Sequence, residues 1–141
     1  MPLICEIVSQ DHQVYKGEVD MVVLPGAAGE MGILPHHSPV LTSLSFGIIT
    51  VKTKTGVEHF TVAGGIAEVQ PDQVTVLADA AENVEEIDID RAIAARQRAE
   101  EAIKNISAAD VDRYMRITTS LKRSALRLQA VQKFRNEKSR M

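Results

Sequence analysis

Short runs of apolar and β-branched residues alternate with turn-forming residues through the first half of the chain. Each run has the length of a single strand, and the segments 9–12, 54–56 and 70–73 between them are typical of hairpin turns. Many short strands with close turns predict an antiparallel β-sandwich or barrel. The apolar runs cover residues 3–8, 19–24, 40–46, 48–51, 57–62, 66–69 and 74–77.

Glycine and proline interrupt this pattern at two places. The pair Gly64-Gly65 falls inside the strand pattern, which indicates a β-bulge or a close approach of two backbones. The segment 25–39 is rich in Gly and Pro but also contains Met31 and Ile33. We predict a loop over 25–39 that is either packed or a contact surface, because long loops with apolar residues tend to be one or the other.

The last third of the chain changes to helical spacing. Apolar residues recur every three or four positions from residue 89 to 106, and again from 114 to 134. Asp88 is placed to cap the first helix, and Ser107 with Asp110 forms a Ser-x-x-Asp helix start. A connection of about two residues predicts an antiparallel pair. The fold class is therefore β + α, an N-terminal antiparallel β-sandwich or barrel followed by an antiparallel two-helix hairpin.

The distribution of charge divides the chain at the same place. The 141 residues carry a net charge of −3. Residues 1–86 hold 3 basic and 12 acidic side chains, whereas residues 87–141 hold 13 basic and 7 acidic ones. We predict a β-sandwich domain over 1–86 and a helical hairpin over 87–141, with different partners. Since the hairpin's alanine-rich contact buries little apolar area, we infer that the hairpin is marginally stable alone and that its docking can change.

The residues offer no recognisable catalytic machinery and no metal site. Cys5 lies in an apolar run, which predicts a core residue rather than a nucleophile. Adjacent His36 and His37 point apart in an extended chain, with no further ligands nearby in the sequence. Phosphate-loop and nucleophile-elbow strings are absent. No window approaches the ~20 apolar residues of a membrane span, and no targeting segment is visible.

Three strings in the first module are long and distinctive. They are Leu-Pro-Gly-Ala-Ala-Gly-Glu-Met-Gly-Ile-Leu-Pro-His-His-Ser-Pro-Val-Leu at 24–41, Val-Ala-Gly-Gly-Ile-Ala-Glu-Val at 62–69 and Val-Thr-Val-Leu-Ala-Asp at 74–79. With the sandwich-then-hairpin order, they resemble the epsilon chain of bacterial-type F-type, proton-driven ATP synthases across nearly the whole chain.

This resemblance implies a non-catalytic rotor-stalk subunit. Its sandwich would bind the gamma subunit and the c-subunit ring, in a complex that couples proton flow to ATP synthesis. Its place would be the cytoplasmic face of the bacterial plasma (inner) membrane, as a peripheral protein. The family places ring and gamma contacts in one loop, at positions held here by Glu30, Met31, Gly32 and His37. The alternative is a structural loop, with Glu30 solvated and His37 hydrogen-bonded locally.

The resemblance also implies that the hairpin regulates the complex. Extended along gamma towards the beta and alpha subunits, it would block rotation in the hydrolysis direction. The basic second helix suits an acidic surface, and the block would run through Arg113, Arg116, Lys122, Arg123 and Arg127. A solvated basic face is the alternative, which is the usual fate of charge runs.

Some members of the family bind ATP on the folded hairpin. An Ile-Asp-x-x-Arg-Ala string is present here, and the implied site comprises Glu82, Ile87, Asp88, Arg91, Ala92, Arg123 and Arg127. ATP would then be a regulatory ligand, and no other cofactor is implied. The structural alternative is that Asp88 caps a helix and Arg91 pairs nearby.

Two other functions compete with this interpretation. A nucleic-acid-binding module would use the basic helix, but the acidic first module and the scarcity of aromatic residues disfavour it. A small β enzyme with a helical lid would need a convergent polar pocket, and the sequence offers none. Pattern and charge alone support a β module with a basic helical hairpin, typical of an interaction protein.

Overall fold

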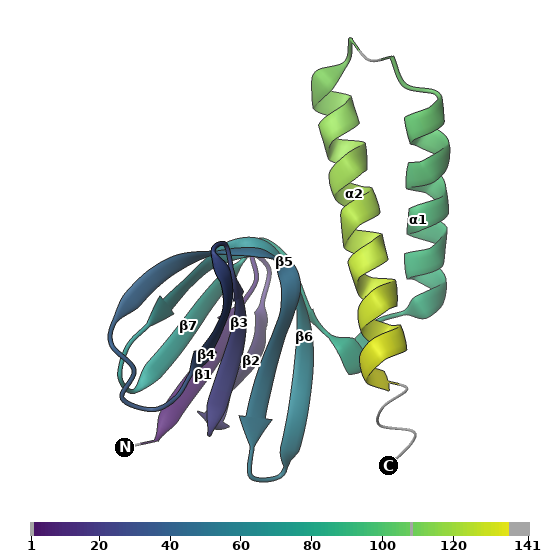
Figure 1. Cartoon of the computed structure of the whole chain (residues 1–141). Helices are drawn as coiled ribbons and strands as arrows, with labels where there is room; N and C mark the ends of the chain where they lie inside the picture. Colours follow the sequence, from purple (N-terminus) through teal and green to yellow (C-terminus); the bar gives the residue numbers. More distant parts are fainter. Residues whose placement is uncertain (1, 108, 136–141) are drawn as a thin grey trace. The chain divides into compact units, whose positions relative to one another are not determined.

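The chain forms two compact units in a computed structural model that describes residues 2–107 and 109–135 (Figure 1). The first unit is Met1–Val84 and contains all the strands. The second is Glu85–Met141 and contains the helical hairpin. A short 3-10 helix, η1 (Val84–Glu86), spans the division between them.

Eight strands build the first unit, in the order β2-β1-β7-β6-β5-β3-β4, with β8 paired to β6. All described pairings are antiparallel except β1 with β7, which is parallel. The predicted β-sandwich is thus confirmed, with one parallel pair that the sequence did not indicate. The strands are β1 (Leu3–Val8), β2 (Gln13–Val19), β3 (Met21–Gly26), β4 (Gly29–Ile33), β5 (Val40–Thr53), β6 (Gly56–Val69), β7 (Gln73–Ala78) and β8 (Ala81–Asn83).

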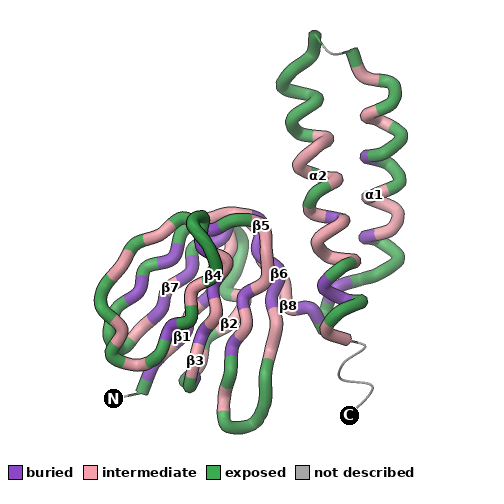
Figure 2. Tube along the Cα trace, in the orientation of Figure 1, coloured by how far each residue is buried: buried purple, intermediate pink, exposed green. Residues whose placement is uncertain are grey.

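The core of the sandwich consists of the inward positions of these strands. Buried residues alternate with residues of mostly intermediate exposure along β1 and β7, as Figure 2 shows along the trace. Phe60 is fully buried, and its ring centroid lies 5.3 Å from that of Tyr15. Cys5 is also in this core, as predicted, and burial raises the pKa of its thiol to about 12. The thiol therefore stays protonated, which makes it a poor nucleophile.

Two long strands replace four of the predicted short ones. The β5–β6 ladder runs from Val40 opposite Val69 to Thr53 opposite Gly56, and continues through Gly47. A Cβ at Gly65 would lie 2.4 Å from the Leu77 carbonyl oxygen, and Gly65 has a φ of 132°. The glycine pair thus marks the predicted close backbone approach. The prediction of separate strands was wrong because glycine lets a strand bend without ending it.

The predicted loop over 25–39 is partly a hairpin. Pro25 and Gly26 complete β3, a turn follows at Ala27-Ala28, and β4 then returns antiparallel. Gly29 follows the turn with a φ of 139°, in a region that favours glycine. The local signal for a hairpin was weak because Gly and Pro are poor strand formers. Only residues 34–39 connect β4 to β5 as a loop.

The second unit is an antiparallel pair of helices, α1 (Ile89–Lys104) and α2 (Val111–Ala130), followed by a π-helical turn, η2 (Val131–Arg135) (Figure 1). Asp88 caps α1 as predicted, accepting from the backbone N–H of Arg91 at 3.1 Å. The predicted start of the second helix at Ser107 was wrong. Asp110 caps α2 instead, so the connection covers residues 105–110.

Candidate functional site

The β3–β4 hairpin presents Glu30 to solvent. Gly26 lies opposite Gly29, and Pro25 lies opposite Glu30. The turn is tied to β5, because the backbone N–H of Ala27 donates to the Ser43 carbonyl at 2.9 Å. Glu30 is exposed beside this anchored turn, which leaves its carboxylate available to a partner.

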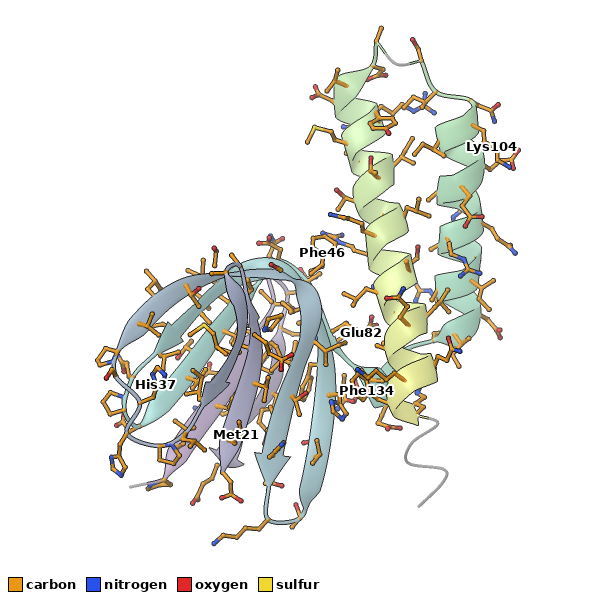
Figure 3. The ribbon with its side chains drawn as sticks, viewed as in Figure 1. Met21, His37, Phe46, Glu82, Lys104 and Phe134 are labelled. Carbon is orange, nitrogen blue, oxygen red and sulfur yellow. The ribbon has the colours of Figure 1, made fainter. Side chains whose placement is uncertain are left out.

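Met31 and Gly32 have different positions on the same strand. Met31 is half-buried and packs against the sandwich core, opposite Leu24. Gly32 faces outward, where a Cβ would lie 2.8 Å from the Cε of Met21. The glycine therefore gives the Met21 side chain room beside β4, and Figure 3 shows Met21 on this unit. Met31 secures the strand that carries Glu30.

His37 lies in the loop that follows β4. Its Nδ1–H donates to the backbone carbonyl of Ser38 at 2.7 Å. The preceding His36 has a φ of 70°, and its backbone N–H donates to the Pro71 carbonyl at 2.8 Å. Glu30 is next to the hairpin turn, whereas His37, labelled in Figure 3, follows the opposite end of β4 in the chain. The structure therefore does not bring these two residues together.

An apolar patch on the outer face of the sandwich was not identified from the sequence. Ile66 and Leu77 are cross-strand neighbours and are 43% and 51% exposed. Leu41 on the adjacent strand is 68% exposed. A cavity of about 420 Å³ adjoins Ile66 and Leu77, and its lining includes Val8 and Gln10. In a strand, successive side chains point to opposite faces, so Ile66 and Leu77 fall on the outer face of runs whose other apolar residues face the core. This alternation was the signal that could have identified the patch.

The residues of the predicted nucleotide site are divided between the two units. Glu82 lies on β8 in the first unit, where its backbone carbonyl accepts from Thr61 Oγ1 at 3.5 Å. Ile87 and Ala92 are buried at the start of the hairpin, whereas Arg91 is exposed there. Asp88 has the capping role described above, which uses one of its carboxylate oxygens.

A basic groove lies between the two helices. One cavity of about 390 Å³ is lined by Ala95, Arg116, Thr119, Ser120, Arg123, Ser124 and Arg127. A second cavity, of about 240 Å³, shares Ala95, Arg116 and Ser120 with it and adds Arg98. Among the described residues, Arg123 Nε is a buried side-chain nitrogen without a hydrogen-bond partner. The groove thus combines guanidinium groups with hydroxyl groups, a combination suited to an anionic ligand.

The predicted basic residues separate into two groups. Arg116, Arg123 and Arg127 line the groove, while Arg113 and Lys122 are exposed and are not among its lining residues. The sequence analysis missed Arg98, which lies seven positions after Arg91. That spacing, two helical turns, was the signal that could have identified it.

The described residues contain no group of three or more His, Cys, Asp or Glu side chains that could share a metal ion. In the described parts of the chain, no helix is both long and apolar enough to cross a membrane.

Both units match one protein family. The beta-sandwich domain of the ATP synthase Delta/Epsilon chain matches residues 2–84, and its long alpha-helix domain matches residues 85–132. The ATP synthase epsilon chain of Dehalococcoides mccartyi is 45% identical over 137 residues, covering 92% of each chain. That of Halalkalibacterium halodurans is 42% identical over 122 residues, covering 86% of this chain and 91% of the relative.

Solved structures share the fold at lower identity. A chain of the Euglena gracilis mitochondrial ATP synthase, OSCP/F1/c-ring in rotational state 1, matches with a TM-score of 0.75 and 22% identity, covering 92% of this chain and 81% of that one. A chain from the central stalk/c-ring of the Tetrahymena thermophila mitochondrial enzyme matches with a TM-score of 0.56 and 12% identity, covering 89% and 97%. From the two family domains and these bacterial relatives, the chain belongs to the ATP synthase epsilon chains, which are non-catalytic subunits of that complex.

Proposed function

We propose that this chain is a central-stalk subunit of the rotor, which helps couple proton flow through the membrane ring to ATP synthesis and restrains ATP hydrolysis through its helices. The observation that carries the proposal is the division into two dissimilar units. One has a large core with an exposed apolar patch, and the other has a small core with a basic groove. The Tetrahymena structure described as central stalk/c-ring shares this fold.

The sandwich is the unit that binds the rotor in this proposal. The apolar patch of Leu41, Ile66 and Leu77 suits the gamma subunit, because exposed apolar clusters mark protein contacts. Glu30 suits a basic polar loop of the c-subunit ring, and Met31 and Gly32, which follow it on β4, belong to the same proposed contact. His37 belongs to the same proposed rotor contacts from the other end of β4.

Two substitutions test these surfaces separately. Leu77→Gln should weaken binding to gamma, whereas Val57→Gln, at a position that is 39% exposed outside the patch, should not. Glu30→Gln should weaken binding to the ring, with Glu18→Gln on β2 as the matched exposed control. Equal losses for a variant and its control would contradict the assigned surface.

The helical hairpin is the brake in this proposal. Arg113, Arg116, Lys122, Arg123 and Arg127 give α2 a strongly basic character that suits an acidic surface on the beta and alpha subunits. The 20 residues of α2 span about 30 Å, which is long enough to reach along a stalk.

The brake is tested with ATP synthase depleted of this subunit. The full chain and a version ending at Glu86 are added back, after binding of both has been confirmed. We expect the full chain to slow ATP hydrolysis and the shortened chain to leave it unchanged. If both bind and neither alters the rate, the helices have no braking role.

ATP is the proposed regulatory ligand of the groove between the helices. The larger cavity has the volume of a small-molecule site, and its three arginines can pair with phosphates. Arg91 lies one helical turn before Ala95, which lines both cavities. Asp88 and Ile87 lie at the start of the same helix.

Calorimetric titration of the full chain with ATP tests this ligand. Arg123→Ala should weaken binding by about tenfold or more, since a charge-assisted hydrogen bond contributes about 1.5–3 kcal/mol. Lys122→Ala removes one positive charge at the neighbouring position and should have little effect. Absence of ATP binding by the unaltered chain would remove the nucleotide from the proposal.

The same proposal places the chain at the cytoplasmic face of a bacterial inner membrane. It would be held there by its partner subunits, as a peripheral protein. Fractionation of cells that contain or lack the rest of the complex tests this location.

A further inference from the structure

The end of the second helix is tied to the segment that leads into the first. Arg135 Nη2 donates to the backbone carbonyl of Ile87 at 2.7 Å, across 48 positions of sequence. Ile87 is only 3% exposed and immediately precedes Asp88, the N-cap of α1. Both residues belong to the helical unit. This contact therefore closes the hairpin at its base, the end opposite the 105–110 connection.

The Ile87 carbonyl lies outside the hydrogen-bond ladder of α1. The first turn of that helix is closed by the Ala92 N–H donating to the Asp88 carbonyl at 3.0 Å. A carbonyl of a buried residue needs a partner, and here the guanidinium is one. A cation at the C-terminal end of α2 is also favoured by the helix dipole. Hydrogen bonds with an ionised donor are about twice as strong as neutral ones.

The backbone changes where this contact is made. The α-helical hydrogen bonding of α2 gives way to the wider π-helical turn of η2, which contains Arg135. Such turns are uncommon and are often found at functional sites. The neighbouring cation, Lys133, has its Nζ 5.2 Å from the centroid of the Phe134 ring. Figure 3 shows Phe134 at the base of the hairpin and Lys104 near the opposite end.

We propose that Arg135 is a clasp that holds the helical hairpin closed at its base, and that its release from Ile87 begins the opening of the hairpin. Apart from Ile87 and Val131, the buried side chains described in this unit are small, so the charged contact adds to a limited apolar closure of the base. As a regulatory device the clasp rests on the proposed braking function, together with the expectation from the sequence that the hairpin acts in an extended form.

Hydrogen exchange of the full chain tests the clasp. In Arg135→Gln, we expect about tenfold faster exchange at the backbone amides of Arg91 and Ala92, which bond to Asp88. The amide of Val131, which donates to carbonyls of α2, should respond similarly. A tenfold increase in the exchange rate corresponds to a loss of about 1.4 kcal/mol in the free energy of opening. Strand amides should be unchanged, which shows that the variant is folded.

Lys133→Gln is the matched control, because it removes a positive charge from the same turn. If it accelerates exchange as much as Arg135→Gln does, the effect is one of charge at the helix end and the clasp is refuted. Unchanged exchange in Arg135→Gln refutes it as well.

Add-back to depleted ATP synthase then separates the clasp from the brake. Arg135→Gln should inhibit ATP hydrolysis more than the unaltered chain does. If exchange accelerates but Arg135→Gln inhibits no more than the unaltered chain does, the clasp closes the hairpin without controlling the brake. The brake itself fails only if the unaltered chain and the chain ending at Glu86 both bind and neither slows hydrolysis.

Discussion

The side chains that stabilise the sandwich differ in size from those that stabilise the helical hairpin. Fully buried side chains in the sandwich include Phe60, Leu3 and Ile7. The helices of the hairpin bury mainly small residues, Ala92, Ala99, Ser124 and Ala130, with Val131 after them. Full burial of a large apolar side chain contributes about 1.5–3 kcal/mol, so the sandwich has much more to lose on unfolding. Alanine contributes far less.

The hairpin relies more on polar contacts at its ends. Asp88 and Asp110 cap the two helices, and Arg135 holds the Ile87 carbonyl. Each such contact contributes about 0.5–3 kcal/mol and can be replaced by water or by a partner. A unit built this way can exchange one arrangement for another, whereas a unit with a large apolar core cannot do so cheaply. This difference fits a fixed rotor contact and a movable regulator.

Removing the largest core side chain should break the sandwich first. Phe60→Ala should lower the free energy of unfolding of this unit by about 3–5 kcal/mol, because it deletes a ring that is fully buried. Urea denaturation followed by circular dichroism measures the loss. Val57→Ala, on the same strand but 39% exposed, is the control and should cost under about 1 kcal/mol. Comparable losses would mean that the apolar core is not what stabilises this unit.

The close approach at Gly65 should be the next most sensitive feature. Gly65→Ala should cost about 2–4 kcal/mol, since it adds a Cβ at 2.4 Å from the Leu77 carbonyl oxygen to a backbone with a φ of 132°. Gly29→Ala has a similar φ of 139° but nothing within 4 Å of the added atom. Thermal denaturation of both variants therefore separates the clash from the backbone strain. Equal costs would assign the whole effect to strain.

High pH should weaken the sandwich through Cys5. Burial, with a smaller contribution from Glu6, raises the pKa of its thiol to about 12 in the folded chain. Since an unfolded thiol has a pKa of about 8.5, the folded state holds the proton more tightly. Stability is therefore complete below about pH 8.5 and falls by up to about 1.4 kcal/mol per pH unit towards pH 12.

The variant Cys5→Val isolates this contribution. Its stability should fall less steeply above pH 9 than that of the unaltered chain, as measured by urea denaturation at several pH values. Tyr15 remains in both proteins, and burial also raises the pKa of its hydroxyl. Identical slopes would show that Cys5 does not control the alkaline loss.

The smallest of these effects should come from a cap of the hairpin. Asp88→Ala should destabilise the start of α1 by about 1 kcal/mol, because the Arg91 N–H loses its acceptor at 3.1 Å. Amide exchange at Arg91 and Ala92 measures the fraying. Asp90→Ala changes a charge in the same first turn without removing a cap, so its effect should be smaller.

The sequence predicted elements well where neighbouring residues decide the outcome. The first strand and the cap at Asp88 follow from patterns within a few positions. Ser107 was mistaken for a cap because Asp110, three positions later, is an equally good one. The hairpin within 25–39 was missed because its glycines and prolines resemble those of a loop, and only pairing with β5 reveals it as part of the sheet.

The sequence by itself determined the two-module organisation, the basic character of the second module and the family strings. The tertiary structure decided which of those residues share a surface. The arginines of the two adjoining cavities lie along one groove, which includes Arg98, Arg116, Arg123 and Arg127. Ile66 and Leu77 are cross-strand neighbours. Arg135 donates a hydrogen bond to the Ile87 carbonyl. The physical reason is that patterning is local, whereas these contacts depend on strand register and helix pairing between residues far apart in the chain.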